Sequence, residues 1–109
     1  MTMVVRATEA EIDVVRKSPD EAIVVFEESV LPALREQDGY QGCYVLLSDE
    51  GKMLVLSFWE SRGAARETRQ SGFYEAQVAK FTDLVLYRQQ PGREMYDVVV
   101  AEAPQPAVA

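Results

Sequence analysis

The chain has 109 residues, a net charge of −7 and a hydrophobic content of 48%, which together indicate one globular domain with a modest core. This acidic balance argues against binding to nucleic-acid phosphates or acidic membranes, because both need basic surfaces. One cysteine and no histidine exclude an intrachain disulfide and leave no imidazole for catalysis or metal binding. The single cysteine and the absence of a signal or membrane-span pattern lead us to expect a cytoplasmic protein.

The first predicted element is a strand at Met3–Thr8, and the residues after it fit two interpretations. Glu9, Glu11 and Asp13 would share one face of a continued strand, whereas the acidic sequence after Thr8 also fits the capping box of a short helix. We favour an extended or irregular segment. The three carboxylates have the chemistry to hold a hard cation, although a charged edge kept soluble by its carboxylates is the simpler interpretation.

Ser18-Pro19-Asp20-Glu21 predicts the start of a long helix, with an N-cap serine, a proline at the first helical position and acids in the first turn. The helix should run from Pro19 to about Gln37 and end at Asp38-Gly39. Pro32 should bend it, because proline removes a backbone donor and crowds the preceding turn. Spacing of 100° per residue predicts one apolar stripe, made of Ile23, Phe26, Val30, Ala33 and Leu34.

Glu27 interrupts the apolar pattern of this helix, since all four of its helical neighbours are aliphatic. A carboxylate held among them would be a candidate general base. The alternative is that Pro32 shifts the phase of the helix, so that Glu27 reaches water or an arginine at a subunit boundary. The second outcome is the commoner one for such a residue.

The stretch Gly42–Glu60 predicts an antiparallel hairpin, in which a short polar turn joins the apolar runs Cys43–Ser48 and Met53–Trp59. Neither face of these strands is polar. Because a one-sided antiparallel sheet carries polar residues on its wet face, we expect both faces of this sheet to be covered. Cys43 is interpreted as a small buried hydrophobic residue.

A short helix, Arg62–Ser71, should follow with Ser61 as its N-cap. Its arginine row has two interpretations: an anion site, or a solvated face that pairs with acids. The residues in this row are Arg62, Arg66 and Arg69.

The next predicted helix is Phe73–Leu86, with Gln77 inside its apolar arc. Gln77 is either a polar group of a pocket or a glutamine bonded to nearby backbone. A loop should follow at residues 89–92, then a last strand at Met95–Glu102. Residues 103–109 are expected to form a terminal extension.

The predicted order of strand, helix, two strands, helix pair and strand is the ferredoxin-like pattern of an α+β domain, here spanning residues 3–102. Both helical regions would pack on one face of a four-stranded antiparallel sheet, which leaves the other apolar face uncovered. A second copy of the same sheet is the simplest cover, so we expect a homodimer formed through the helix-free face.

Three segments resemble domains of the antibiotic-biosynthesis-monooxygenase type: Val30–Glu36 in the long helix, the turn Gly39–Gly42, and the strand end Ser57–Ser61. The resemblance covers roughly Met3 to Glu102. It implies a dimeric α+β barrel that oxygenates a polycyclic phenol or quinol, without metal or flavin, in a pocket between helices and sheet. Trp59 matches the pocket tryptophan at the end of the family's third strand.

The chain departs from that pattern in two residue types. Family members that oxygenate aromatic polyketides or degrade haem commonly use an inner-strand asparagine, and haem degraders add a histidine ligand. This chain contains neither residue. Haem degradation through a histidine ligand is therefore excluded, and no cofactor is expected.

Three hypotheses for the function remain open: a cofactor-free monooxygenase acting on a small aromatic or quinol-type compound, a non-catalytic dimer that binds an apolar metabolite, and a structural module without a cavity. The expected site combines apolar walls, one orienting amide and one base. Its residues are Trp59, Tyr44, Tyr74, Phe81 and Phe26 as walls, Gln77 as the amide and Glu27 as the base.

Overall fold

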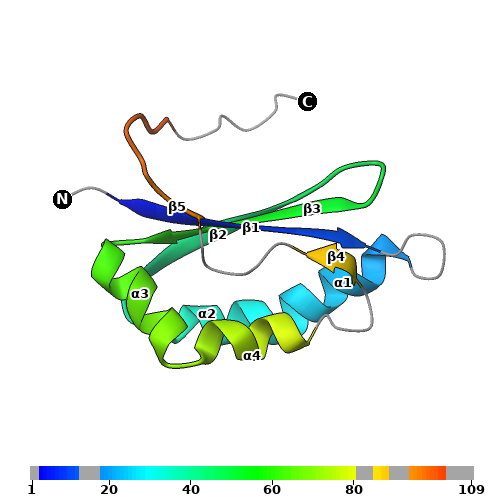
Figure 1. Ribbon diagram of the computed structural model, residues 1–109, viewed down its shortest axis with the longest axis horizontal. Helices are drawn as coiled ribbons and strands as arrows, with labels where there is room; N and C mark the ends of the chain where they lie inside the picture. Colours follow the sequence, from blue (N-terminus) through cyan, green and yellow to red (C-terminus); the bar gives the residue numbers. More distant parts are fainter. Residues whose placement is uncertain (1–2, 13–17, 81–84, 89–93, 103–109) are drawn as a thin grey trace, which may run out of the picture.

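The computed structural model describes residues 3–12, 18–80, 85–88 and 94–102, and shows an antiparallel sheet with all the labelled helices on one face (Figure 1). The sheet has the order β2-β3-β1-β4, and β5 also pairs with β1. This arrangement confirms the predicted ferredoxin-like α+β fold. The strands are β1 Val4–Ile12, β2 Tyr40–Leu47, β3 Lys52–Trp59, β4 Val85–Arg88 and β5 Glu94–Asp97.

Strand β1 is the central strand of the sheet. It pairs with β3 from Val4 to Glu11, and its other edge is shared by β5 at one end and β4 at the other. The predicted last strand appears as β5, and β4 is an additional short strand that the sequence did not predict. The segment Glu9–Ile12 belongs to β1, so the extended interpretation of these residues is confirmed; Asp13 lies outside the described residues.

The long helix begins as predicted and changes its winding in the middle. The Asp20 backbone N–H donates to Ser18 Oγ over 3.2 Å at its start. Its three parts are α1 Pro19–Val25, a π-helical turn η1 Phe26–Val30, and α2 Leu31–Arg35. The wide turn ends two residues before Pro32, which lacks an N–H and crowds the turn before it. The helix is therefore irregular close to the proline at which a bend is predicted, and it ends two residues earlier than expected.

The hairpin of β2 and β3 agrees with the prediction and closes through Ser48 and Gly51. The Ser48 N–H donates to the Lys52 carbonyl over 2.9 Å, and the Gly51 N–H donates to the Ser48 carbonyl over 3.1 Å. Gly51 has a φ of 90°, a left-handed conformation that glycine adopts at little cost. Alternate residues of β3, ending at Ser57 and Trp59, are buried toward the helices.

The two helices after the hairpin are shorter than the prediction. They are α3 Arg62–Gln70 and α4 Phe73–Ala79. The expected helix Phe73–Leu86 is wrong in its last part, because Val85 and Leu86 belong to β4 and extend the sheet. A short run of aliphatic residues does not distinguish a strand from a buried helix end.

The last strand is also shorter than predicted. The Val98 N–H donates to the Met3 carbonyl over 2.9 Å, and beyond this bond the chain leaves the sheet. Val99 and Val100 are 87% and 86% exposed. The predicted loop at 89–92 and the extension at 103–109 lie outside the described residues.

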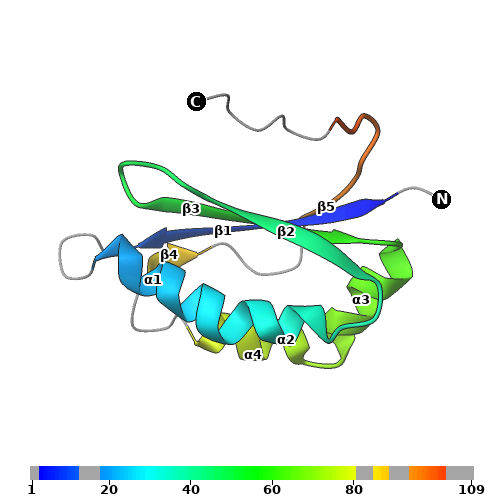
Figure 2. The same ribbon diagram turned by 180° about the vertical axis from the view of Figure 1, so that it is seen from behind.

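The core lies between the sheet and the helical layer, in which the long helix and α4 run side by side (Figures 1 and 2). Of the predicted helical stripe, Phe26, Val30 and Leu34 are buried, whereas Ile23 and Ala33 are half-buried. Among the described residues, no helix combines the length and the apolar character needed to cross a bilayer. The buried hydrophobic cluster consists of Ile12, Ala22, Phe26, Val30, Leu34, Met53, Trp59 and Ala65.

Candidate functional site

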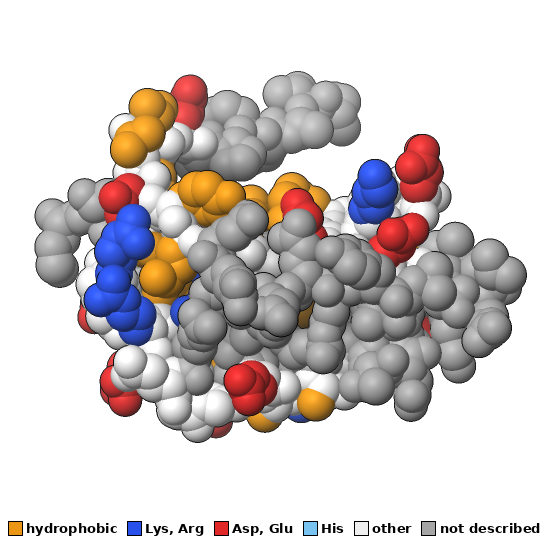
Figure 3. All heavy atoms as spheres, viewed as in Figure 1, with side chains coloured by type: hydrophobic (Ala, Val, Ile, Leu, Met, Phe, Trp, Pro, Cys, Tyr) orange, Lys and Arg blue, Asp and Glu red, His pale blue; other side chains and the backbone are white. Residues whose placement is uncertain are grey.

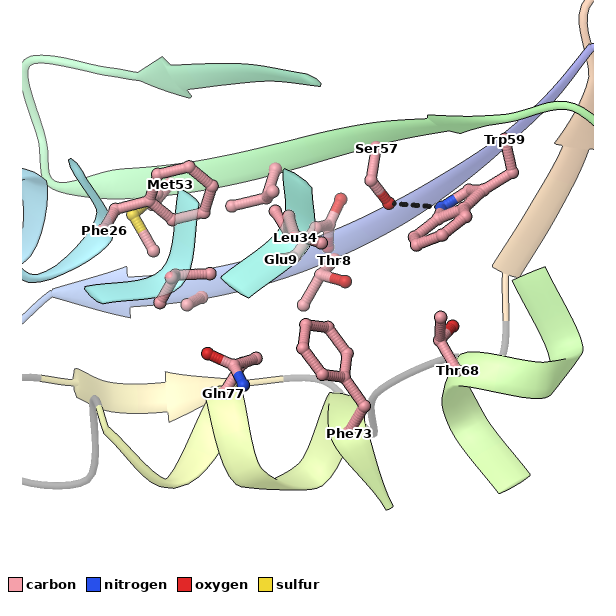
Figure 4. A pocket seen from close by; sticks show the side chains of 13 residues that line it. Thr8, Glu9, Phe26, Leu34, Met53, Ser57, Trp59, Thr68, Phe73 and Gln77 are labelled. Atoms are coloured by element: carbon pink, nitrogen blue, oxygen red, sulfur yellow. Dashed lines mark hydrogen bonds between the residues drawn. The ribbon is translucent and has the colours of Figure 1, made fainter. Parts of the chain in front are cut away.

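A cavity of about 90 Å³ lies between the helix-facing side of the sheet and the helical layer. Figure 4 shows Ser57 and Trp59 on one wall, Phe73 and Gln77 rising from α4 toward them, and Thr68 at one end. Its lining is mostly apolar, and it is partly open to solvent. The lining residues are Thr8, Glu9, Ala10, Phe26, Val30, Leu34, Met53, Val55, Ser57, Trp59, Thr68, Phe73 and Gln77.

Trp59 and Ser57 form one polar pair in this apolar wall. They are two residues apart on β3, so both point to the helix-facing side of the sheet. The indole Nε1–H donates to Ser57 Oγ over 2.9 Å (Figure 4), and both residues are buried. Tyr40 packs edge-on against the indole at a centroid distance of 5.6 Å. The indole orientation is therefore fixed by one hydrogen bond and one aromatic contact.

Arg6 supports the Trp59 end of the pocket, although the sequence reasoning did not select it. Its side chain is 1% exposed. It donates from Nη2 to the Ala65 carbonyl over 2.6 Å and from Nη1 to Thr68 Oγ1 over 3.3 Å. Arg6 therefore pins α3 to β1 beside the pocket. The alternation of side chains along β1 could have identified Arg6 from the sequence, because it places Arg6 on the helix-facing side of the sheet with Val4 and Thr8.

Gln77 lines the pocket from α4 and interacts with a lysine one turn further along the chain. Lys80 Nζ donates to Gln77 Oε1 over 2.8 Å and to the Ser29 carbonyl over 3.4 Å. The second contact links α4 to η1, so Lys80 bridges the two helices that form the lower wall. The polar-group interpretation of Gln77 agrees with this position on the pocket lining.

The structure brings together Trp59, Phe26 and Gln77 of the expected site, all of which line the pocket. Tyr44 is on the wrong face for a pocket wall: it is 49% exposed and packs edge-on against Phe58 at 5.7 Å on the helix-free side. Strand alternation explains this, since Tyr44 lies between the helix-facing residues Cys43 and Val45.

Glu27 is exposed and does not line the pocket, so the structure agrees with the interpretation in which Glu27 reaches water and does not support its role as a base in the pocket. The long helix turns Phe26 and Val30 inward, which directs Glu27 to solvent. Phe81 lies outside the described residues, and so does the side chain of Tyr74.

The ionisable groups near the pocket are few. Of the described lining residues, Glu9 alone carries a carboxylate, and it is exposed. Burial, then the hydrogen bond with Cys43, raises the pKa of Tyr40. No cluster of metal-binding side chains occurs within the described ranges. The lining therefore suits an uncharged, largely apolar molecule better than a charged one.

The arginine row of α3 lies outside this pocket. Arg62 Nη2 pairs with Asp97 Oδ1 at 3.1 Å, and both side chains are substantially exposed. Arg66 is also exposed, and the side chain of Arg69 is not described. For Arg62 the structure thus agrees with the interpretation of a solvated residue paired with an acid.

The size of the cavity restricts the guest. An apolar cavity of about 150 Å³ holds benzene, and pockets for drug-sized ligands span about 300–1,000 Å³. A cavity of about 90 Å³ is smaller than either. A ring-sized guest must therefore extend through the open side or widen the gap between α4 and the long helix.

Comparisons with known proteins identify relatives of the same architecture. Residues 7–80 match the family model described as antibiotic biosynthesis monooxygenase. Among curated proteins, none matches the chain.

Two similar solved structures span almost the whole chain. The protein of unknown function NE2512 from Nitrosomonas europaea has a TM-score of 0.67 at 19% identity, covering 97% of this chain and 98% of its own. SnoaB from Streptomyces nogalater, a cofactor-independent oxygenase, has a TM-score of 0.68 at 12% identity, covering 94% and 97%. Identities this low show a shared fold and leave the activity open.

Proposed function

The chain belongs to the antibiotic biosynthesis monooxygenase family, and on that premise we propose that it oxygenates a small aromatic or quinol-type compound without a metal or flavin. The observation that carries the proposal is the apolar cavity beside the buried, hydrogen-bonded Trp59. SnoaB, a cofactor-independent oxygenase by its description, has the same fold, which adds support from analogy alone.

The proposed reaction requires the substrate to supply the electrons for oxygen reduction. An anthrone-type methylene would lose two hydrogens and gain one oxygen atom as a carbonyl, while the second oxygen atom leaves as water. The apolar lining would exclude bulk water from the activated substrate. Because Glu27 lies outside the pocket, we assign it no part in removing a proton. The substrate must therefore be acidic enough to ionise without a strong protein base.

Oxygen consumption tests this proposal directly. Metal-free protein is mixed with a panel of anthrone and alkylated hydroquinones in an oxygen electrode, and the products are identified by mass spectrometry. We expect consumption above the uncatalysed rate, with one oxygen atom from ¹⁸O₂ incorporated per anthrone. Wild-type rates equal to those of buffer across the panel would contradict the proposal.

A non-catalytic ligand-binding role is the second candidate function. The observation that favours it is the scarcity of ionisable groups on the pocket, where Glu9 alone of the described lining residues carries a carboxylate. This role predicts saturable binding of quinols with no oxygen consumption. A quinol-binding titration and the oxygen-consumption measurement therefore separate the two candidate functions.

We also propose that a second copy of the chain covers the helix-free face of the sheet. Hydrophobic side chains gather along the sheet and on the segment after β5 (Figure 3). Both are surfaces that a monomer would leave in water. The exposed large hydrophobic residues on this side and on the following segment are Tyr44, Leu46, Tyr96, Val99 and Val100.

Light scattering coupled to size-exclusion chromatography tests the dimer. The expected mass is twice the 12.2 kDa of one chain, and Leu46→Glu should shift the population toward monomer because it places a charge in the apolar face. A wild-type mass of one chain at micromolar concentration would overturn this assembly.

A further inference from the structure

We propose that Gln77, positioned by Lys80, makes the pocket selective for ligands with a hydrogen-bond-accepting oxygen, such as an aromatic ketone or quinone. The inference rests on the proposed ligand pocket and adds a chemical class to it. Its starting observation is the 2.8 Å contact between Lys80 Nζ and Gln77 Oε1, at a residue that lines the cavity.

This contact fixes which end of the amide is engaged. An ammonium group has only donors, so the atom that faces it must be the amide oxygen. The side-chain NH₂ of Gln77 then remains for a guest. Among the residues that the structure describes, no acceptor is bonded to Gln77 Nε2. Gln77 therefore keeps both N–H donors of its amide for a guest, while its oxygen already accepts one hydrogen bond from Lys80.

Of the hydroxyl groups on the lining, that of Thr68 is less suited to bind such an oxygen. The Thr68 hydroxyl donates to the Ala65 carbonyl over 2.7 Å and accepts from Arg6, so its proton is already used. Ser57 accepts the Trp59 indole N–H and keeps its own O–H proton as a donor on the β3 wall, so the Gln77→Met comparison below separates the contribution of Gln77 from that of Ser57. In apolar surroundings a donor gains more from an acceptor than it would in water. A guest oxygen near Gln77 would therefore be favoured over an equally large hydrocarbon.

Lys80 acts here as a positioning residue. Its ammonium group contacts both Gln77 Oε1 and the Ser29 carbonyl of η1, which holds the amide at a set distance from the facing helix. Its positive charge also polarises the amide, and a charge-assisted hydrogen bond is stronger than a neutral one. Loss of the lysine would free the amide to rotate and present its oxygen to the guest.

The test compares two probes of similar shape, acetophenone and isopropylbenzene, in which a carbonyl oxygen of the first takes the place of a methyl group of the second. Heteronuclear NMR titrations give the dissociation constant of each for wild type, Gln77→Met, Lys80→Met and Lys80→Arg. The measured quantity is the preference for the ketone, defined as the ratio of the two constants. Urea unfolding of each variant confirms that it folds.

We expect Gln77→Met and Lys80→Met to lower the ketone preference by about 3- to 10-fold, the value of one hydrogen bond, and Lys80→Arg to keep it within about twofold. A merely structural role would change both dissociation constants together and leave their ratio unchanged. Binding of both probes with an unchanged ratio in Gln77→Met would overturn this inference alone. Binding of neither probe to the wild type would overturn the pocket proposal as well.

Discussion

Trp59 Nε1 donates to Ser57 Oγ over 2.9 Å inside the wall of the cavity. The two residues are buried on the same face of β3, so the bond holds the indole plane against the space that a guest would fill. Because the chain contains one tryptophan, any optical signal of this residue reports on the pocket alone.

Ser57→Ala should destabilise the protein, because it leaves the buried indole N–H without its acceptor. We expect a loss of about 1–3 kcal/mol in the free energy of unfolding, measured by urea titration. Ser29→Ala is the matched control, since that hydroxyl is half-buried on the long helix and makes no side-chain hydrogen bond among those described. Equal losses in both variants would show that the Trp59 bond contributes nothing specific.

Gly39→Ala should destabilise the junction between the long helix and β2. Gly39 has a φ of 82°, and a Cβ built there would lie 2.5 Å from Ala64 Cβ of α3. Backbone strain and this clash together should cost about 1–3 kcal/mol.

Gly63→Ala is the matched control for that substitution. It lies in α3, where a new Cβ meets Ser61 Oγ at an ordinary 3.7 Å, so it should be neutral or stabilising by up to about 1 kcal/mol. Thermal unfolding of the two variants gives the comparison. A stability of Gly39→Ala equal to that of wild type would refute the close packing of α3 on this turn.

Tyr40 should make the protein less stable in alkaline solution. Burial, then the hydrogen bond with Cys43, raises the pKa of Tyr40 above its ordinary value of 10.0. Above that value the unfolded chain loses the phenol proton before the folded one does, so stability falls as the pH rises. Tyr40→Phe should reduce this fall, measured as urea midpoints between about pH 9 and 11. Identical midpoint changes in both proteins would contradict the assignment.

Glu27→Gln should leave ligand affinity and any oxygen consumption within about twofold of wild type, as expected for an exposed side chain away from the site. Glu27 does not line the cavity, and the residues beside it, Phe26 and Val30, supply that wall instead. A loss of more than about tenfold, with unfolding unchanged, would mean that Glu27 reaches the guest in the working protein.

Most of the fold could be predicted because its signals are local. The Ser18 cap, the hairpin turn and the apolar alternation of β3 each depend on neighbouring residues, and the structure agrees with all three. The additional strand Val85–Arg88 could not be predicted, since pairing with β1 overrides the helical pattern of a short aliphatic run.

The site was predictable in part for a similar reason. Trp59, Phe26 and Gln77 follow from strand parity and helical phase, whereas the parity of β2 places Tyr44 on the face opposite Cys43 and Val45, outside the pocket. For Glu27 the sequence left two interpretations open, and the structure agrees with the solvated one. A carboxylate at the border of an apolar stripe can turn either way, and the packing of the whole helix decides the direction.

A titration of Trp59 fluorescence with methylhydroquinone tests the central claim, that the cavity is the functional site. Val30→Leu and Val30→Phe enlarge a buried lining residue, and Val24→Phe makes the same change on the exposed side of the same long helix. We predict saturable quenching in the wild type and in Val24→Phe, and affinity at least about tenfold weaker in the Val30 variants. Quenching that does not saturate in the wild type, or equal affinity in all four proteins, would contradict the claim that the cavity is the functional site.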